Sequence, residues 1–288
     1  MSRALVLAGG GVGGIAWEVG FLLGVQEASS AAATYLLTSD LILGTSAGAT
    51  VAAQIAGGAS LPDLFASQIA ESTSEIEPQV DMALLVDMFG ADADKPPIER
   101  LRRIGALAMG ANTVSAQVRR EVIESRLPAQ VWPDRRLATT ATDATSGEVV
   151  IFERDDKVPL VDAVAASCAV PGLWPTVAIN GRRYMDGGVR STGNALLARG
   201  HDEVIVLCPS PEPGSYLMGG SLVEELANLK DSAVLLPVFA DSQSESALGS
   251  NPLSPATRAP AARAGRSQGQ QSAHLISTLK QLAAQQAR

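Results

Sequence analysis

Residues 41–56 read LILGTSAGATVAAQIA: an apolar run, a serine framed by two glycines, and a stretch of small residues. The pattern predicts a buried strand, a sharp turn with Ser46 at its apex, and a helix. Glycine suits positions Gly44 and Gly48, because side chains there would collide across so tight a turn. The turn would hold the serine hydroxyl at the positive end of the helix. We therefore expect a strand–turn–helix unit in a parallel sheet covered by helices.

A glycine-rich loop precedes this unit, at residues 9–14, and reads GGGVGG. It follows the apolar segment 4–8 and leads into apolar residues at helical spacing. Backbone N–H groups beside a helix N-terminus bind anions, whether a phosphate or the oxyanion of a transition state. A dinucleotide site would also need an acidic residue at the end of the next strand. Because Asp40 precedes that strand and the Ser46 turn ends it, dinucleotide binding is the less favoured alternative.

The rest of the chain alternates between helical and extended patterns. Residues 60–130 are mostly helical in pattern, and a short apolar helix is expected at 161–169. The turn Asn180-Gly181 joins two expected strands in a hairpin. The strands expected here lie at residues 137–142, 148–152, 176–179, 182–184 and 203–208. We find no internal repeat.

A third motif, Asp186-Gly187-Gly188, follows the hairpin. An aspartate followed by two glycines can reach into a cleft with little steric cover, although an ordinary Asx turn has the same pattern. A serine nucleophile needs a base to take its proton. The two histidines, His201 and His274, have no motif around them. We therefore consider a catalytic pair of serine and aspartate that works without histidine.

Composition excludes several classes of protein. The net charge of −8 argues against nucleic acid as a partner and against electrostatic adhesion to anionic membranes. Cys168 and Cys208 lack metal-binding spacing and indicate buried thiols in a reducing compartment. The N-terminal apolar stretch is too short for a signal peptide, and no apolar run reaches the length of a membrane span. We expect a cytoplasmic protein of unassigned oligomeric state.

The last part of the chain differs in composition. Residues 242–271 are rich in Ser, Pro, Ala, Gly and Gln, which favours a partly irregular segment, and a helical pattern follows at 270–288. No acidic residue follows Glu245, and the tail carries five cations: Arg258, Arg263, Arg266, Lys280 and Arg288. We therefore divide the chain into a main domain, 1–245, and a basic tail, 246–288, packed on the acidic domain.

Together, these motifs resemble those of the patatin-like phospholipase family. The resemblance covers residues 4–210 and includes the segments 142–148 and 166–175 (ASCAVPGLWP). It implies a three-layer α/β/α fold with a mostly parallel central sheet, and a serine lipid acyl hydrolase without metal or cofactor. The implied catalytic pair is Ser46 as nucleophile and Asp186 as proton acceptor. The implied oxyanion hole is Gly9, Gly10, Gly11, Gly14 and Ala47, with Gly44 and Gly48 shaping the serine turn and Gly187 and Gly188 supporting Asp186.

The implied substrate is a carboxylic ester of a phospholipid, lysophospholipid or acylglycerol, cleaved through an acyl-Ser46 intermediate. An acyltransferase using the same pair is an alternative. Family members usually carry Arg or Lys where this chain has Gly13, which puts the efficiency of the site in question rather than its reaction class. Segment 98–107 is amphipathic and Arg-rich; it predicts either a helix packed on the body or a surface for transient membrane contact.

Overall fold

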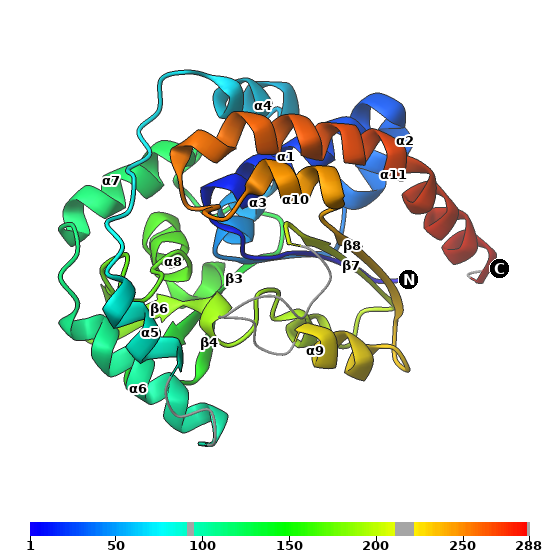
Figure 1. The fold of residues 1–288 in the computed structure, drawn as a ribbon. Coiled ribbons are helices and arrows are strands. Elements are labelled where there is room, and N and C mark those ends of the chain that lie inside the picture. Colours follow the sequence, from blue (N-terminus) through cyan, green and yellow to red (C-terminus); the bar gives the residue numbers. More distant parts are fainter. Residues whose placement is uncertain (91–94, 211–221, 287–288) are drawn as a thin grey trace.

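The computed structural model describes residues 1–90, 95–210 and 222–286, which form an α/β fold around a central sheet (Figure 1). In this part of the chain the sheet has eight strands, in the order β5-β6-β3-β2-β1-β7-β8, with β4 paired to β3 off this path. Strands β3, β2, β1, β7 and β8 are parallel, and β4, β5 and β6 form an antiparallel edge, so the expected mostly parallel sheet is confirmed. The strands are β1 (Arg3–Leu7), β2 (Leu41–Thr45), β3 (Leu137–Asp143), β4 (Val149–Phe152), β5 (Val177–Ile179), β6 (Arg182–Asp186), β7 (Glu203–Cys208) and β8 (Val234–Phe239).

Helices surround this sheet (Figure 1). They are α1 (Gly11–Ala28), α2 (Ser30–Leu37), α3 (Ala47–Ala56), α4 (Leu61–Ile69), α5 (Met82–Gly90), α6 (Pro97–Gly110), α7 (Ala116–Arg126), α8 (Leu160–Ser167), α9 (Leu222–Leu229), α10 (Ser242–Leu248) and α11 (Arg258–Gln286). The predicted helical region between the first two strands and the third contains α4 to α7.

Seven of these strands lie where the sequence predicts them, whereas β8 is absent from the prediction. β8 contains Pro237, which has no N–H to give to a sheet. Among the described strands it pairs with β7 alone and forms the edge of the sheet, where a missing donor leaves no neighbour unsatisfied.

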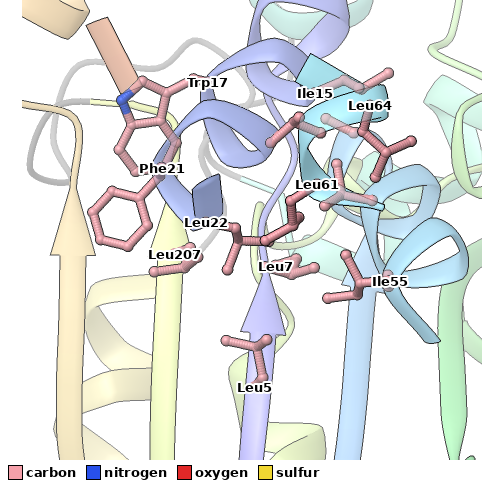
Figure 2. Packing of buried hydrophobic residues seen from close by; sticks show 14 of the residues in the cluster. Leu5, Leu7, Ile15, Trp17, Phe21, Leu22, Ile55, Leu61, Leu64 and Leu207 are labelled. Atoms are coloured by element: carbon pink, nitrogen blue, oxygen red, sulfur yellow. The ribbon is translucent and has the colours of Figure 1, made fainter. Parts of the chain in front are cut away.

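Both faces of the sheet are buried, but the apolar cluster on one face is much larger than the cluster on the other. On one face, alternate residues such as Leu5, Leu7 and Leu207 pack against α1, α3, α8 and α11 in one large apolar cluster. Figure 2 shows Trp17 and Phe21 of α1 over these strands. On the other face, the intervening residues pack against the 3₁₀ turn Ala195–Ala198 and α9. This alternation gives the parallel strands their continuous apolar sequences, because both faces are buried.

Helix α11 packs directly along α1 (Figure 1). At four glycines an added Cβ would lie 2.0–2.3 Å from a backbone carbonyl oxygen of the opposite helix: Gly20 and Gly24 on α1, and Gly265 and Gly269 on α11. No real Cβ contact is that short, so the helices reach this separation only because all four positions are glycine. Trp17 adds a hydrogen bond from its indole N–H to the side-chain oxygen of Gln268.

The irregular part of segment 242–271 is confined to the connection between α10 and α11, and most of the segment is helical. This stretch contains α10 and the start of α11, which begins at Arg258 rather than near residue 270. The small residues that look like low-complexity sequence are those that let α11 approach α1. The tail therefore shares the main apolar cluster with the N-terminal half through Ala261, Ala262 and Ile276. The boundary at residue 245 stays a prediction.

Helix α6 contains the amphipathic segment 98–107. Its apolar side is buried through Leu101, Ile104 and Ala108. Arg102 donates to the carbonyl oxygen of Ser146, and Arg103 pairs with the carboxylate of Asp87. These contacts favour the packed-helix interpretation over a free interfacial surface. Among the described residues, no helix has both the length and the apolarity that a membrane span requires.

Candidate active site

Ser46 lies at the turn between β2 and α3, with φ 55° and ψ −114°. A non-glycine residue in this conformation stores strain and is held there by its surroundings. An added Cβ at Gly44 would lie 2.4 Å from the carbonyl oxygen of Gly48, across the turn, as the sequence predicts. At Gly48 the collision would instead be with β1, where the carbonyl oxygen of Leu7 would lie at 2.0 Å.

The start of the ASCAVPGLWP segment supports the serine turn. The N–H of Ser46 donates to the Ser167 hydroxyl at 2.8 Å, and the Cys168 thiol donates to the Ser46 carbonyl oxygen at 3.1 Å. Burial raises the pKa of the Cys168 thiol, so the group stays protonated and can donate. These two bonds satisfy the peptide groups on both sides of the strained residue.

The glycine-rich loop lies beside Ser46 because β1 and β2 are paired neighbours, with Leu7 opposite Gly44. An added Cβ at Gly9 would lie 3.3 Å from the Cβ of Ser46. The loop then enters α1, whose first N–H groups have no partner in the helix. Loop and serine turn thus present two helix N-termini to the same space.

The predicted oxyanion donors divide into two groups. Gly9 and Gly14 already donate their N–H groups to backbone carbonyl oxygens, at 2.8 Å each. Within the described part of the chain, the N–H groups of Gly10, Gly11 and Ala47 donate to no protein acceptor. Gly11 also has φ +64°, a conformation that glycine adopts without strain. Three of the five predicted donors are therefore available to a ligand.

A side chain at position 13, where the family resemblance leads us to expect Arg or Lys, would require the neighbouring side chains to shift. The Gly13 N–H donates to the Pro252 carbonyl oxygen, and an added Cβ would lie 2.8 Å from Thr257 Oγ1 and 2.9 Å from Leu248 Cδ2. The connection between α10 and α11 therefore fills the space into which a side chain at position 13 would point.

Asp186 ends β6, opposite Ala141 of β3, and the neighbouring Thr140 is opposite Thr45 of β2. This register places Asp186 and Ser46 on either side of β3, although 140 positions separate them in the sequence. Asp186 is 3% exposed, and its Oδ1 accepts the Gly188 N–H at 2.7 Å. The two glycines after it thus support one carboxylate oxygen.

The second carboxylate oxygen of Asp186, Oδ2, is buried without a well-formed hydrogen bond to any described residue. Burial raises the pKa of Asp186 to about 7, and the Ser46 hydroxyl, the Gly188 N–H and the Arg119 charge oppose this rise. The Ser46 hydroxyl is thus close to Asp186, but in a looser contact than a standard hydrogen bond. Such contacts between catalytic groups often tighten only when substrate binds.

The buried amide of Asn194 connects these elements, and sequence reasoning missed it. Its Nδ2 lies 2.9–3.3 Å from four acceptors: Thr45 Oγ1, Thr140 Oγ1, the Gly187 carbonyl oxygen and the Ser191 carbonyl oxygen. Asn194 has φ 48°, which asparagine tolerates better than most residues. Its amide thereby ties the strand before Ser46 to the turn after Asp186.

Neither histidine is placed to act as the base. His201 precedes β7. Because β2, β1 and β7 run parallel, the start of β7 and the end of β2, where Ser46 follows, lie at opposite ends of the strands. The Nδ1 of His201 lies 2.9 Å from the Ala198 carbonyl oxygen. His274 is exposed on α11. The described residues also contain no cluster of His, Cys, Asp and Glu side chains that could hold a metal ion.

A narrow cavity of about 10 Å³ opens beside Ser46, and two arginines of α7 line it. Arg126 forms a buried double hydrogen bond with Glu75, whereas Arg119 stacks on Trp174 with its guanidinium carbon 3.8 Å from the ring centroid. A larger cavity of about 670 Å³ shares Ile15 and Arg126 with the narrow one, but its lining does not include Ser46. Sequence reasoning missed both arginines, since nothing in a charged helix marks which charges are buried.

The family model for patatin-like phospholipase matches residues 5–199. The chain therefore belongs to the patatin-like phospholipase family, and at the level of the family it is a lipid ester hydrolase.

No curated protein matches the chain. Among solved structures, it is similar to VipD from Legionella pneumophila, with a TM-score of 0.47 and 14% identity over 96% of this chain and 67% of that one. It is also similar to a structure of SpcU in complex with ExoU from the type III secretion system of Pseudomonas aeruginosa, with a TM-score of 0.41 and 17% identity over 96% and 52% of the two chains. The chain thus spans about half the length of that second match.

Proposed function

We propose that this chain hydrolyses carboxylic esters of lipids through an acyl intermediate on Ser46, with Asp186 as the base. The observation that carries the proposal is the pairing of a strained serine turn with a buried carboxyl group whose pKa is about 7. An ordinary carboxylate is too weak a base for an alcohol, and the raised pKa improves the match at neutral pH. At this pH a useful fraction of the carboxyl is still ionised and can accept a proton.

The first step joins the Ser46 oxygen to the ester carbonyl carbon while the hydroxyl proton passes to Asp186 Oδ2, the oxygen that lacks a firm partner. The carbonyl oxygen becomes an oxyanion, and the N–H groups of Gly10, Gly11 and Ala47 supply free donors nearby. Collapse of the adduct breaks the ester bond, and the proton on Asp186 goes to the leaving alcohol. Water then attacks the acyl-Ser46 carbonyl carbon while Asp186 takes a proton from it. Collapse of this second adduct breaks the bond between the acyl group and the Ser46 oxygen, releases the fatty acid and returns the proton from Asp186 to Ser46.

Ester hydrolysis by Ser46→Ala, Asp186→Asn and the wild-type protein tests this proposal. We expect each substitution to lower kcat/KM for a medium-chain monoacylglycerol by about a thousandfold or more, because the paired groups act as a unit. Ser72→Ala, in an exposed loop, is the matched control and should behave as wild type. Ser46→Ala should also lose covalent labelling by a fluorophosphonate. Full turnover by Ser46→Ala would contradict the proposal.

The same acyl-enzyme could pass its acyl group to an alcohol or thiol, which is the acyltransferase alternative. Product analysis with and without added glycerol or a small thiol separates the two: free fatty acid as the main product supports the hydrolase, and a new ester or thioester supports the transferase. The dinucleotide alternative is weaker, because Gly9 and Gly13 in the glycine-rich loop already donate their N–H groups to backbone carbonyls. A cytoplasmic location and transient membrane contact through α6 remain proposals.

A further inference from the structure

Arg119 is a buried cation for which the described part of the chain supplies no hydrogen-bond acceptor. It is 6% exposed, and its Nε and Nη1 make no hydrogen bond to any residue that the structure describes. Buried guanidinium groups normally donate hydrogen bonds to carboxylate or carbonyl oxygens, because a buried donor without an acceptor has lost its hydrogen bonds to water and gained none in return. The stacking on Trp174 satisfies the flat face of the guanidinium but none of its in-plane N–H groups. Those N–H groups are free for a ligand.

The charges around Arg119 leave it cationic and without a dedicated counter-ion. Burial, followed by repulsion from Arg126, lowers its pKa to about 9, while Cys168, Glu75 and Asp186 oppose the decrease. It therefore stays charged at neutral pH. Glu75 is already engaged in two hydrogen bonds with Arg126. Asp186 attracts Arg119 through space but forms no hydrogen bond with it.

Arg119 lines the same narrow cavity as Ser46, Gly11 and Ala47. A ligand anion held by Arg119 would therefore sit within one small molecule's length of the proposed nucleophile and oxyanion donors. The only other cation that lines this cavity among the described residues, Arg126, is occupied by Glu75. Leu253, from the connection between α10 and α11, gives this cavity an apolar wall.

We infer that Arg119 binds the phosphodiester of a phospholipid or lysophospholipid while Ser46 attacks its carboxylic ester, and so selects phosphate-bearing esters over neutral acylglycerols. This inference rests on the proposed function. A phosphate diester offers two anionic oxygens to the N–H groups of an arginine, which is the pairing in which charge-assisted hydrogen bonds are strongest. The phosphate would also give the buried Arg119 guanidinium an anionic partner in place of the water that it lost on burial.

The competing interpretation is that Arg119 acts only on Asp186, by keeping its carboxylate ionised. That role would affect every ester equally and would shift the acid limb of the pH profile, since loss of a nearby cation raises a carboxyl pKa. A phosphate-binding role would affect only substrates that carry phosphate. Comparing two substrates with the same acyl chain, each at the pH plateau of each variant, separates the two roles.

The test compares 1-acyl-lysophosphatidylcholine with 1-monoacylglycerol for wild type, Arg119→Met and Arg119→Lys. We expect Arg119→Met to lose about 10- to 100-fold in kcat/KM for the lysophospholipid, as for deletion of charged hydrogen bonds, and to keep its rate on monoacylglycerol. Arg119→Lys should recover part of the loss, because it restores the charge without the planar group. Arg120→Met is the matched control: Arg120 is the next residue on α7, partly exposed and paired with Asp162. Equal losses on both substrates would overturn the inference.

A binding measurement separates this inference from the proposed function. Calorimetric titration of sn-glycerol 3-phosphate into Ser46→Ala, with and without Arg119→Met, reports the phosphate site without turnover. Binding that disappears with Arg119→Met supports the inference even if Ser46 is not the nucleophile, and binding unaffected by Arg119→Met overturns it. Inorganic phosphate serves as a second probe. If it binds through Arg119 while the substrate preference is unchanged, the site takes free phosphate and the lipid assignment is overturned.

Discussion

Replacing Asp186 with asparagine should abolish activity and, above neutral pH, stabilise the fold. The carboxyl group of Asp186 is almost completely buried, and burial moves its pKa from 3.8 to about 7. Asparagine has nearly the same shape as the protonated carboxyl and never ionises. The variant therefore keeps the neutral form that the buried environment favours and removes the charged form that it opposes.

The magnitude follows from linkage between protonation and folding. Between pH 4 and pH 7 the unfolded chain has lost the Asp186 proton while the folded chain still holds it, so the free energy of unfolding falls as pH rises. A pKa increase of about three corresponds to about 4 kcal/mol at 1.36 kcal/mol each. The contribution is fully present below pH 4 and is lost as pH rises through the folded-state pKa of about 7.

Urea unfolding of wild type and Asp186→Asn at several values between pH 4 and pH 8 measures this effect. All other titrating groups are shared, so the difference between the two unfolding free energies isolates Asp186. We expect Asp186→Asn to gain up to about 4 kcal/mol on wild type over this interval, levelling off above pH 7. The acid limb of kcat/KM in wild type should fall at the same pH. A difference that does not change with pH would refute the reasoning, because it would place an ordinary carboxyl pKa at this position.

Two further substitutions test the scaffold. Gly265→Ala should destabilise the fold by about 2 kcal/mol or more in urea unfolding, since its Cβ would lie 2.3 Å from the Trp17 carbonyl oxygen, whereas Gly110→Ala, with open space around it, should cost nothing; the reverse order would show that α11 does not pack tightly on α1. Asn194→Ala should cost about 2 kcal/mol, because it removes a buried amide whose two N–H bonds are shared among four acceptors, and should lower kcat more than it raises KM. Unchanged kcat in a folded Asn194→Ala protein would remove its positioning role.

The sheet could be predicted from the sequence because its signals are local. Apolar runs bounded by glycine, as at β1, β2 and β7, predict buried parallel strands, and the Asn180-Gly181 turn predicts the β5–β6 hairpin. The sequence analysis missed β8 and placed the start of α11 too late, because the signals for these two elements depend on distant parts of the chain. Pro237 is acceptable only because β8 is an edge, and the glycines of α11 favour a helix only because α1 lies against them.

The residues of the candidate site also fall into two groups: those that belong to a sequence motif and those that do not. Ser46, the glycine-rich loop and Asp186 each belong to a motif whose letters are adjacent in sequence. Arg119 and Asn194 belong to no motif: Arg119 is one of three arginines on α7, and Asn194 precedes a short 3₁₀ turn. The roles that we propose for them rest on their burial and on the groups around them, which single-sequence patterns do not report. Likewise, the sequence does not show that only Gly10, Gly11 and Ala47 of the five predicted oxyanion donors have available N–H groups. That result depends on which backbone carbonyl oxygens accept from the other two in the folded chain.

By itself, the sequence determined the strand–turn–helix around Ser46, the glycine-rich loop and the positions of seven strands along the chain, because backbone conformation over a few residues depends on glycine, proline and the spacing of apolar side chains. Only the tertiary structure decided that Asp186 lies next to Ser46 with its pKa near 7, that Arg119 is unmatched beside them, and that α11 completes the core. Those properties depend on loss of water and on contacts between residues far apart in the chain, and such long-range contacts exist only once the chain has folded.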